Sequence, residues 1–463
     1  MRGQETPIRI RLALAVGLAV CGATSGAGAG SFDPLASNNL VYPSAAEWSG
    51  EYRPANLNYP TSPVPPPMEP GFGRGAITLQ NAAAYMSDLK EILVPTIGNL
   101  VNAPNDWTPA ENGWYDMPWM AQGTALSDGR IDPTSGREAI QGSYTGQALE
   151  RATFTDPQPA VRFQNYAVIY YNGTAAAMLG RLWRNLYEPD LSQARFPEGS
   201  IVVKVGSATL TPQQWPPLEG SSLGYVYRPS MKTLLDPNKT YKTPEVVPLR
   251  FSQMAIAVKD SVASPQTGWV YMAFTYDTNA EGVTVWDRTV PVGAMWGNDP
   301  EAARVPSGLP PDGKLKETWL NLDAPAFTHQ TLGWGGRLAG PMDVATRHGV
   351  FTVSGKDYGQ DPFPASSCLS CHGAAQYPMV ANLYASPNTH FPTDGDPFLF
   401  YDPGSEDWAN WFQNLPGDEP MSGAGRQGLV GLDYDLLLLF AVMGANAAIG
   451  NDAFALSPLP HVH

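Results

Sequence analysis

The chain has 463 residues, a formal net charge of −15 at pH 7 and three cysteines. Such an acidic chain repels phosphate backbones, so nucleic acid is excluded as an expected partner. Three cysteines do not suffice for a disulfide framework, but a chain of this length can bury a hydrophobic core without one.

The first segment, residues 1–29, has the three parts of a cleavable signal peptide. Basic residues precede the apolar run LALAVGLAV, and the small-residue stretch GATSGAGAG follows it. Cleavage after Ala29 satisfies the preference for small residues at the cleavage site, and the apolar run is too short for a permanent membrane span. The sequence therefore predicts export to the periplasm, with no integral membrane span in the rest of the chain.

Cys21, which follows Val20 in this segment, offers an alternative reading as the lipidated cysteine of a bacterial lipoprotein. Valine is a poor fit to the small residue expected there. We therefore expect Cys21 to leave with the signal peptide and the mature chain to keep two cysteines.

The N-terminal half of the mature chain is divided by its composition. Residues 30–75 are rich in Pro, Asn, Ser and Gly and indicate an extended arm on the surface. The apolar spacing predicts a helix over 77–93 that stops at Pro95, and a second helix over 163–187. Residues 105–160 lie between them and lack periodicity, which indicates a loop-rich insertion. We expect residues 76–198 to form a helical and loop-rich region.

From residue 199 onward the sequence favours strands. The segments SIVVKVG, QMAIAVKD, GWVYMAFTYD and GVTVWDRTVPVGAMW are rich in β-branched and aromatic residues and are separated by turn-like stretches. A final apolar helix is expected over 434–448, too short to cross a membrane and therefore buried. The sequence thus predicts an α+β fold: an antiparallel sheet core with flanking helices, long loop-rich insertions and a β-rich domain over 199–463.

The motif that indicates chemistry is Cys368-Leu-Ser-Cys371-His372, the C-x-x-C-H pattern of covalent c-type haem attachment. Two thiols three residues apart on one helical turn can bond both vinyl groups of one haem, and the adjacent histidine can bind the iron. Because bacterial haem attachment takes place outside the cytoplasmic membrane, the signal peptide and the motif support each other. We expect one covalent haem c near the C-terminal end, with His372 as proximal iron ligand.

Two other chemistries use paired cysteines. A structural zinc ion needs four protein ligands, of which the motif supplies only part. A thioredoxin-like dithiol needs a βαβ context, which the surrounding sequence lacks.

The sixth iron ligand decides between electron transfer and chemistry on a bound small molecule. Met421, fifty residues beyond the attachment motif, is the candidate whose spacing resembles that of small electron-transfer cytochromes. Tyr377 and Tyr401 are candidate partners of a haem propionate. The other candidates for the distal position are Met379, His390, His329, His348 and Met443.

The segments RFPEGSIVVKV, QMAIAVKD and GWVYMAFTYD, followed by the late haem motif, resemble the family of cytochrome c′-beta and the hydroxylamine-oxidising cytochromes. The resemblance implies an antiparallel sheet against the haem and an iron with an open distal face. It also implies a lysine cross-linked to the haem, for which Lys204 is the first candidate and Lys259 the second. The chain departs from the family in its greater length and in the long gap between Lys204 and Cys368.

The gap contains the segment TWLNLDAPAFTHQTLGWGGRLAGPMD, which has no counterpart in that family. His329, Trp334 and Arg337 within it are candidates to face the haem, with a packed structural loop as the alternative. His329, Arg337 and Asp343 are the candidate acid and base groups of an enzyme.

Two functions remain open at this point. The first is an exported monohaem electron carrier with a redox partner protein, which requires a saturated iron. The second is a haem enzyme or gas-binding protein acting on hydroxylamine, nitric oxide or peroxide, which requires an open position at the iron for the small-molecule ligand.

Overall fold

The structure is a computed structural model, and it describes the following residues: 32–149, 151, 154, 157–301, 315–328, 351–353, 356–358, 367–378, 406–421 and 429–450. The expected signal peptide over 1–29 and Cys21 lie outside these ranges.

The centre of the molecule is a nine-stranded sheet whose paired strands all run antiparallel, so the predicted α+β class is confirmed. The strand order is β1-β3-β4-β6-β7-β8-β9, with β2 also paired to β3 and β5 to β6. Because β3 and β4 pair along most of their length, the boundary expected at 198/199 falls inside this sheet. The strands are β1 Trp114–Tyr115, β2 Tyr144–Leu149, β3 Phe163–Asn172, β4 Ile201–Ala208, β5 Leu223–Arg228, β6 Glu245–Lys259, β7 Trp269–Tyr276, β8 Thr289–Met295 and β9 Thr318–Leu320.

Two short strand pairs lie outside this sheet, β10 Phe351–Val353 with β11 Lys356–Tyr358 and β12 Gln376–Tyr377 with β13 Val430–Gly431. The α-helices are α1 Ala82–Leu93, α2 Asn99–Asn102, α3 Gly173–Leu182, α4 Met231–Leu234, α5 Cys368–Gly373, α6 Glu406–Trp411 and α7 Leu436–Ala448. Short turns of other helix types are η1 Pro70–Gly73, η2 Val94–Gly98, η4 Leu191–Gln193, η5 Pro216–Leu218 and η7 Ala326–Thr328.

The helix expected over 163–187 is wrong in its first half. Residues 163–172 form strand β3, and only Gly173–Leu182 is helical. All but one of the β3 side chains are buried, because neighbouring elements cover both faces of the strand. A strand buried on both faces has a continuous apolar sequence, which periodicity does not distinguish from a helix. The change occurs at Asn172, whose side chain caps α3 by accepting from the Ala175 N–H.

The helix expected over 77–93 starts later, at Ala82, and ends at Leu93 as predicted. A π-helical turn, η2, takes Pro95 into its first positions and leads directly into α2. Proline lacks an N–H group, but the first turn of a helical segment needs no such donor. The α-helix thus ends before Pro95 as predicted, while helical winding of another type continues through the proline.

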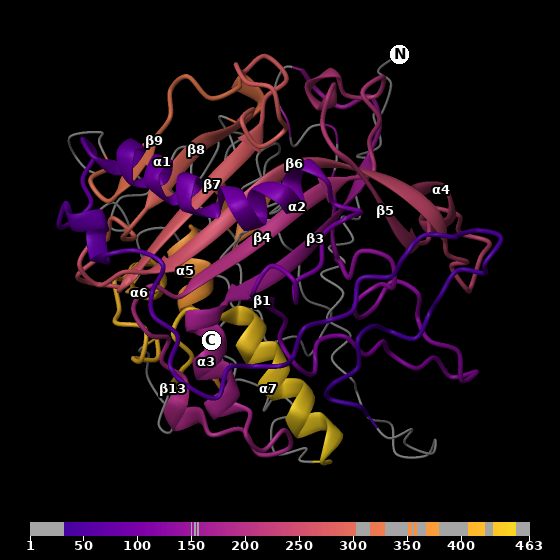
Figure 1. Ribbon diagram of the computed structural model, residues 1–463, viewed down its shortest axis with the longest axis horizontal. Helices are drawn as coiled ribbons and strands as arrows, with labels where there is room; N and C mark the ends of the chain where they lie inside the picture. The colour runs from indigo at the N-terminus through magenta and orange to yellow at the C-terminus, as the bar shows by residue number, and fades with distance from the viewer. Residues whose placement is uncertain are drawn as a thin grey trace.

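The sheet has two buried faces of different composition. One face packs against α1, α2 and η2 in a cluster formed largely by Met, Leu, Ile, Val and aromatic side chains. The other face packs against α3, α5 and α7, and includes Trp269, Tyr271 and Met295. Figure 1 shows α1 and α2 running across the strands, with α3, α5 and α7 grouped together below them in the view. We call these the α1 face and the motif face.

In the segment 32–75 the regular structure is limited to η1. The segment is nevertheless anchored: Arg53 is 6% exposed, and its guanidinium donates to the carbonyls of Trp107 and Gln141 at 2.9 and 3.0 Å. Buried hydrogen bonds to charged groups fix a chain that has few backbone partners of its own.

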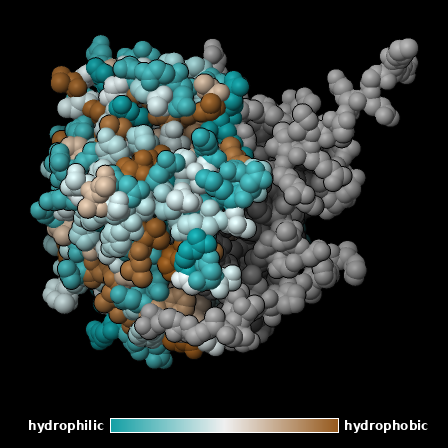
Figure 2. Space-filling view, turned by 90° about the vertical axis from the view of Figure 1, so that its right-hand side faces the viewer, coloured by the Kyte–Doolittle hydropathy of each residue, from teal (hydrophilic) through white to brown (hydrophobic). Residues whose placement is uncertain are grey.

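No helix among the described residues is long and apolar enough to cross a membrane. Figure 2 shows one side of the molecule, where apolar residues form separate patches between polar ones. The final helix α7 lies within the predicted range 434–448, and five of its side chains are buried, as expected.

Candidate functional site

The C-x-x-C-H residues form the short helix α5, which a capping box begins. The Ser367 Oγ accepts from the Ser370 N–H at 2.9 Å, and the Ser370 Oγ accepts from the Ser367 N–H at 2.7 Å. The Ser367 Oγ also donates to Asn298 Oδ1 at 2.5 Å, just beyond β8. With Leu369 fully buried in the core of the motif face, the helix is fixed in position at its start.

Neither cysteine of α5 is part of a disulfide. Cys368 is 8% exposed and Cys371 is more exposed, with one helical turn between them. Among the described residues, no group of three or more His, Cys, Asp or Glu side chains is arranged to hold a metal ion. The four-ligand set of a structural zinc site is thus absent from the described part of the chain.

His372 is held by a backbone carbonyl. Its Nδ1 lies 2.8 Å from the carbonyl oxygen of Tyr434. A carbonyl oxygen only accepts, so Nδ1 must carry the hydrogen and the lone pair is on Nε2. Burial lowers the pKa of His372 to about 4; the bond to Tyr434 opposes this effect and the positive charge of Lys204 adds to it. His372 is therefore a neutral imidazole at neutral pH, with Nε2 ready to bind a metal.

The Tyr434 carbonyl belongs to a rigid turn that precedes α7. The Asp433 carboxylate is fully buried and accepts from Lys259 Nζ at 2.7 Å, Trp269 Nε1 at 2.8 Å and the Phe196 N–H at 2.6 Å. The second candidate for a haem cross-link, Lys259, is thus engaged in a buried ion pair on β6. This pair ties the turn to the motif face of the sheet.

Lys204, the first candidate for a cross-link, lies on the motif face near His372. Its Cα pairs with Ile169 on β3 and Ala255 on β6, and its charge is close enough to lower the pKa of His372. The same row of the sheet continues through Ala255, Ala273 and Gly293. Ala255 is exposed and Ala273 is partly exposed, so small side chains leave open a strip of the sheet next to Tyr271.

Other candidates from the sequence lie around α5. Met421 is 2% exposed, and its methyl group is 3.8 Å from the point where a Cβ on Gly373 would lie. Met443 is partly buried on α7 within the same core cluster. Tyr377 is 8% exposed on β12, the strand that follows the helix. Met421 is thus close to α5, and its role as distal ligand stays a prediction.

The remaining candidates fall outside the described residues. They are His329, Trp334, Arg337, Asp343, His348, Met379, His390 and Tyr401.

Sequence reasoning missed three groups of this site: the Tyr434 carbonyl, the Asp433 carboxylate and the Tyr271 hydroxyl. Tyr271 Oη donates to the Tyr434 carbonyl at 3.0 Å, and its ring centroid is 4.8 Å from that of His372. One available signal was Asp435, which directly precedes the apolar run of α7 and is its N-cap. That cap indicates a tight turn before the helix but does not indicate what the turn contacts.

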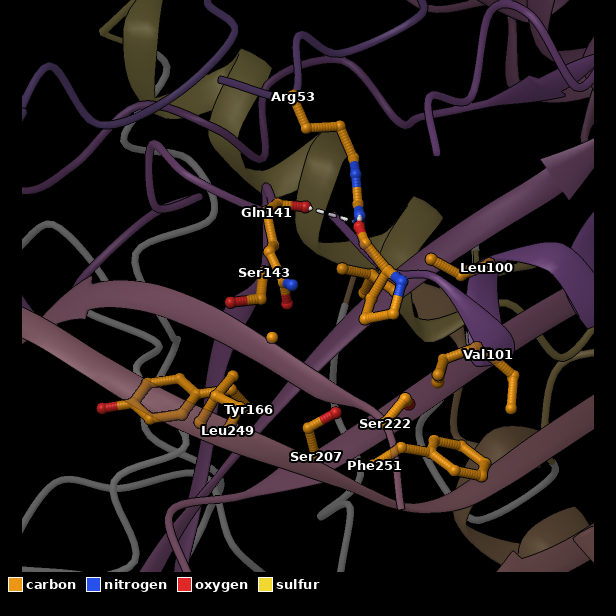
Figure 3. Close-up of a pocket in the computed structure, with 14 residues that line it drawn as sticks. Arg53, Leu100, Val101, Gln141, Ser143, Tyr166, Ser207, Ser222, Leu249 and Phe251 are labelled. Carbon is orange, nitrogen blue, oxygen red and sulfur yellow. Dashed lines mark hydrogen bonds between the residues drawn. The ribbon is translucent and has the colours of Figure 1, made fainter. Parts of the chain in front are cut away.

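A separate cavity lies between the sheet and the arm, away from the motif. Figure 3 shows Arg53, Gln141 and Ser143 above Tyr166 and Phe251, with Arg53 bonded to the Gln141 carbonyl. Its volume of about 20 Å³ accommodates a single water molecule. The cavity therefore does not compete with the motif as a site for a cofactor.

Neither the protein-family models nor the curated proteins nor the solved structures contain a match to this chain. The function is therefore inferred from the geometry of the C-x-x-C-H site.

Proposed function

We propose that this protein is an exported monohaem c-type cytochrome that transfers electrons in the periplasm. One haem c would be attached through Cys368 and Cys371, with His372 as axial ligand to its iron. The observation that carries the proposal is the hydrogen bond from His372 Nδ1 to the Tyr434 carbonyl, because it fixes the ring and leaves Nε2 free for iron.

Three further features support it. The two cysteines lie one helical turn apart, and the partly buried imidazole of His372 is neutral. Beside His372, the row of Ala255, Ala273 and Gly293 provides a strip of small side chains against which a flat group fits. A bound haem supplies one-electron redox chemistry, while the chain's own residues orient His372 and exclude water on the Tyr434 side. Electron transfer requires a redox partner protein.

The test is expression of the full chain in a host that exports it and attaches haem. We expect a covalent haem spectrum with sharp ferrous α and β bands and no response to carbon monoxide, the behaviour of a six-coordinate electron carrier. The variants Cys368→Ala and Cys371→Ala would each lose one thioether, and the double variant would lose covalent haem. A control is Ser207→Ala on β4, a partly exposed serine away from the motif, which should retain the haem. A wild-type protein without covalent haem would refute the proposal.

Export is tested separately by sequencing the N-terminus of the protein from the periplasmic fraction. We expect a mature chain that starts at Gly30, after loss of residues 1–29. Retention of Cys21 with an attached lipid would replace this expectation with the lipoprotein alternative.

A second candidate function is a haem enzyme or gas-binding protein with an open iron site, and the position of Lys204 favours it. The ammonium lies on the sheet face that His372 covers, within range to influence its pKa. Under this alternative the ferrous spectrum would be high-spin and would shift with carbon monoxide. Mass spectrometry of a peptide digest would find the peptide containing Lys204 joined to the haem, whereas Lys204→Arg would remove that link.

A further inference from the structure

The Tyr434 carbonyl accepts two hydrogen bonds from opposite elements. His372 Nδ1 on α5 lies 2.8 Å from the oxygen, and Tyr271 Oη on β7 lies 3.0 Å from it. The two rings are inclined at 51° with centroids 4.8 Å apart, so both donors approach the same oxygen together. A carbonyl oxygen has two lone pairs, and the two donors use both.

The turn that presents this carbonyl is constrained on every side. Asp433 and Tyr434 have φ angles of 50° and 64°, a left-handed conformation that is costly for residues other than glycine. The Asp433 carboxylate, bonded to Lys259, Trp269 and a backbone N–H, holds the turn in this conformation. The carbonyl therefore keeps its direction when either donor is removed.

Two hydrogen bonds donated to one carbonyl oxygen weaken each other, because each donor withdraws electron density from the shared oxygen. A weaker bond from Nδ1–H gives the imidazole less anionic character, and a less anionic axial ligand stabilises ferric iron less. We propose that the Tyr271 hydroxyl is a positioning group of the axial ligand, which raises the reduction potential by sharing the carbonyl that holds His372. This inference rests on the proposed haem attachment.

The test is Tyr271→Phe in the haem-loaded protein, because phenylalanine keeps the ring and removes only the hydroxyl. We expect the midpoint potential to fall, with a change of up to about tenfold in the reduction equilibrium, or about 59 mV for one electron. The proton NMR signal of the His372 Nδ1–H, in the diamagnetic ferrous protein, should move downfield, because its hydrogen bond to the Tyr434 carbonyl becomes stronger. The matched control is Tyr171→Phe: this tyrosine is buried on the same face but donates to Asp435 Oδ1 at 3.1 Å. It should change neither measurement.

A second variant tests whether a stronger hydrogen bond from residue 271 changes the midpoint potential in the opposite direction. A fluorinated tyrosine at position 271 is a stronger donor and should raise the potential. An unchanged or raised potential in Tyr271→Phe, with normal covalent haem content, would overturn this inference and leave the proposed function intact. A wild-type chain without covalent haem would overturn both.

Discussion

The two faces of the central sheet are covered by different kinds of side chain, and among the described residues only the motif face keeps an open strip at Ala255 and Ala273. The α1 face is closed by apolar side chains such as Met86, Leu89 and Ile256, each at most 1% exposed. The motif face also has an apolar core, but it includes the fully buried Asp433 and nearly buried Lys259. Buried charges seldom increase stability over an apolar core, but they specify one arrangement of the groups that they bind. The α1 face thus supplies stability, whereas the motif face positions His372.

The largest expected effect breaks the ion pair of the motif face. Asp433→Asn leaves the Lys259 ammonium buried without its carboxylate, and removal of one partner of a buried pair costs about 3–5 kcal/mol. Urea denaturation of the variant and the parent measures this loss. The control is the double variant with Lys259→Met, which removes the stranded charge and should recover part of the stability. An Asp433→Asn protein as stable as its parent would contradict the role of the pair.

On the α1 face, Leu89→Ala tests whether this face supplies stability without affecting the position of His372. The side chain is fully buried in the apolar cluster of α1, so truncation should cost about 2–5 kcal/mol in the same urea experiment. If the proposed haem is attached, its spectrum and midpoint potential in the folded variant should match those of the parent. A shifted potential would show that the two faces are coupled and would weaken the comparison.

The sequence predicts the attachment helix but not its partner, for a physical reason. The C-x-x-C-H pattern lies within five consecutive positions, and haem attachment requires cysteine or histidine at three of them. The acceptor for His372 is a backbone carbonyl 62 residues later, and any residue type at Tyr434 provides a carbonyl. Aspartate tolerates a left-handed backbone, but Tyr434 does not favour one, and no glycine or asparagine marks the turn.

The strands show the same limit. The segments of β4, β6 and β7 were predicted because β-branched and aromatic residues stand between clear turns. Strand β3 was predicted as a helix because its neighbours bury it on both faces and no turn separates it from α3. Propensity describes the segment, but only the sheet partners decide its state.

A third prediction concerns pH. Burial raises the pKa of Asp435 from 3.8 to about 6, although the Leu438 N–H and the Tyr171 hydroxyl both donate to it. Since the folded chain binds this proton more tightly than the unfolded chain, the contribution is complete below about pH 4 and is lost as the pH rises through about 6. The difference amounts to up to about 3 kcal/mol.

Asp435→Asn removes the charge and keeps a good N-cap for α7. The variant should therefore match the parent at pH 4 and exceed its stability at pH 7.5. Urea denaturation at several pH values between these limits measures the change. A stability difference that is independent of pH would contradict a raised pKa at this carboxyl.

The smallest effect is expected for a surface pair with the same geometry as the buried one. Lys316 Nζ lies 2.7 Å from Glu301 Oε2, the distance also found between Lys259 and Asp433, but these side chains are 57% and 67% exposed. Water screens the attraction between two exposed charges, so the pair contributes little to stability. Lys316→Ala should therefore change the free energy of unfolding by less than about 1 kcal/mol. Measured beside Asp433→Asn, this variant separates distance from burial. If both variants lost similar stability, the environment of the motif face would not explain the strength of its ion pair.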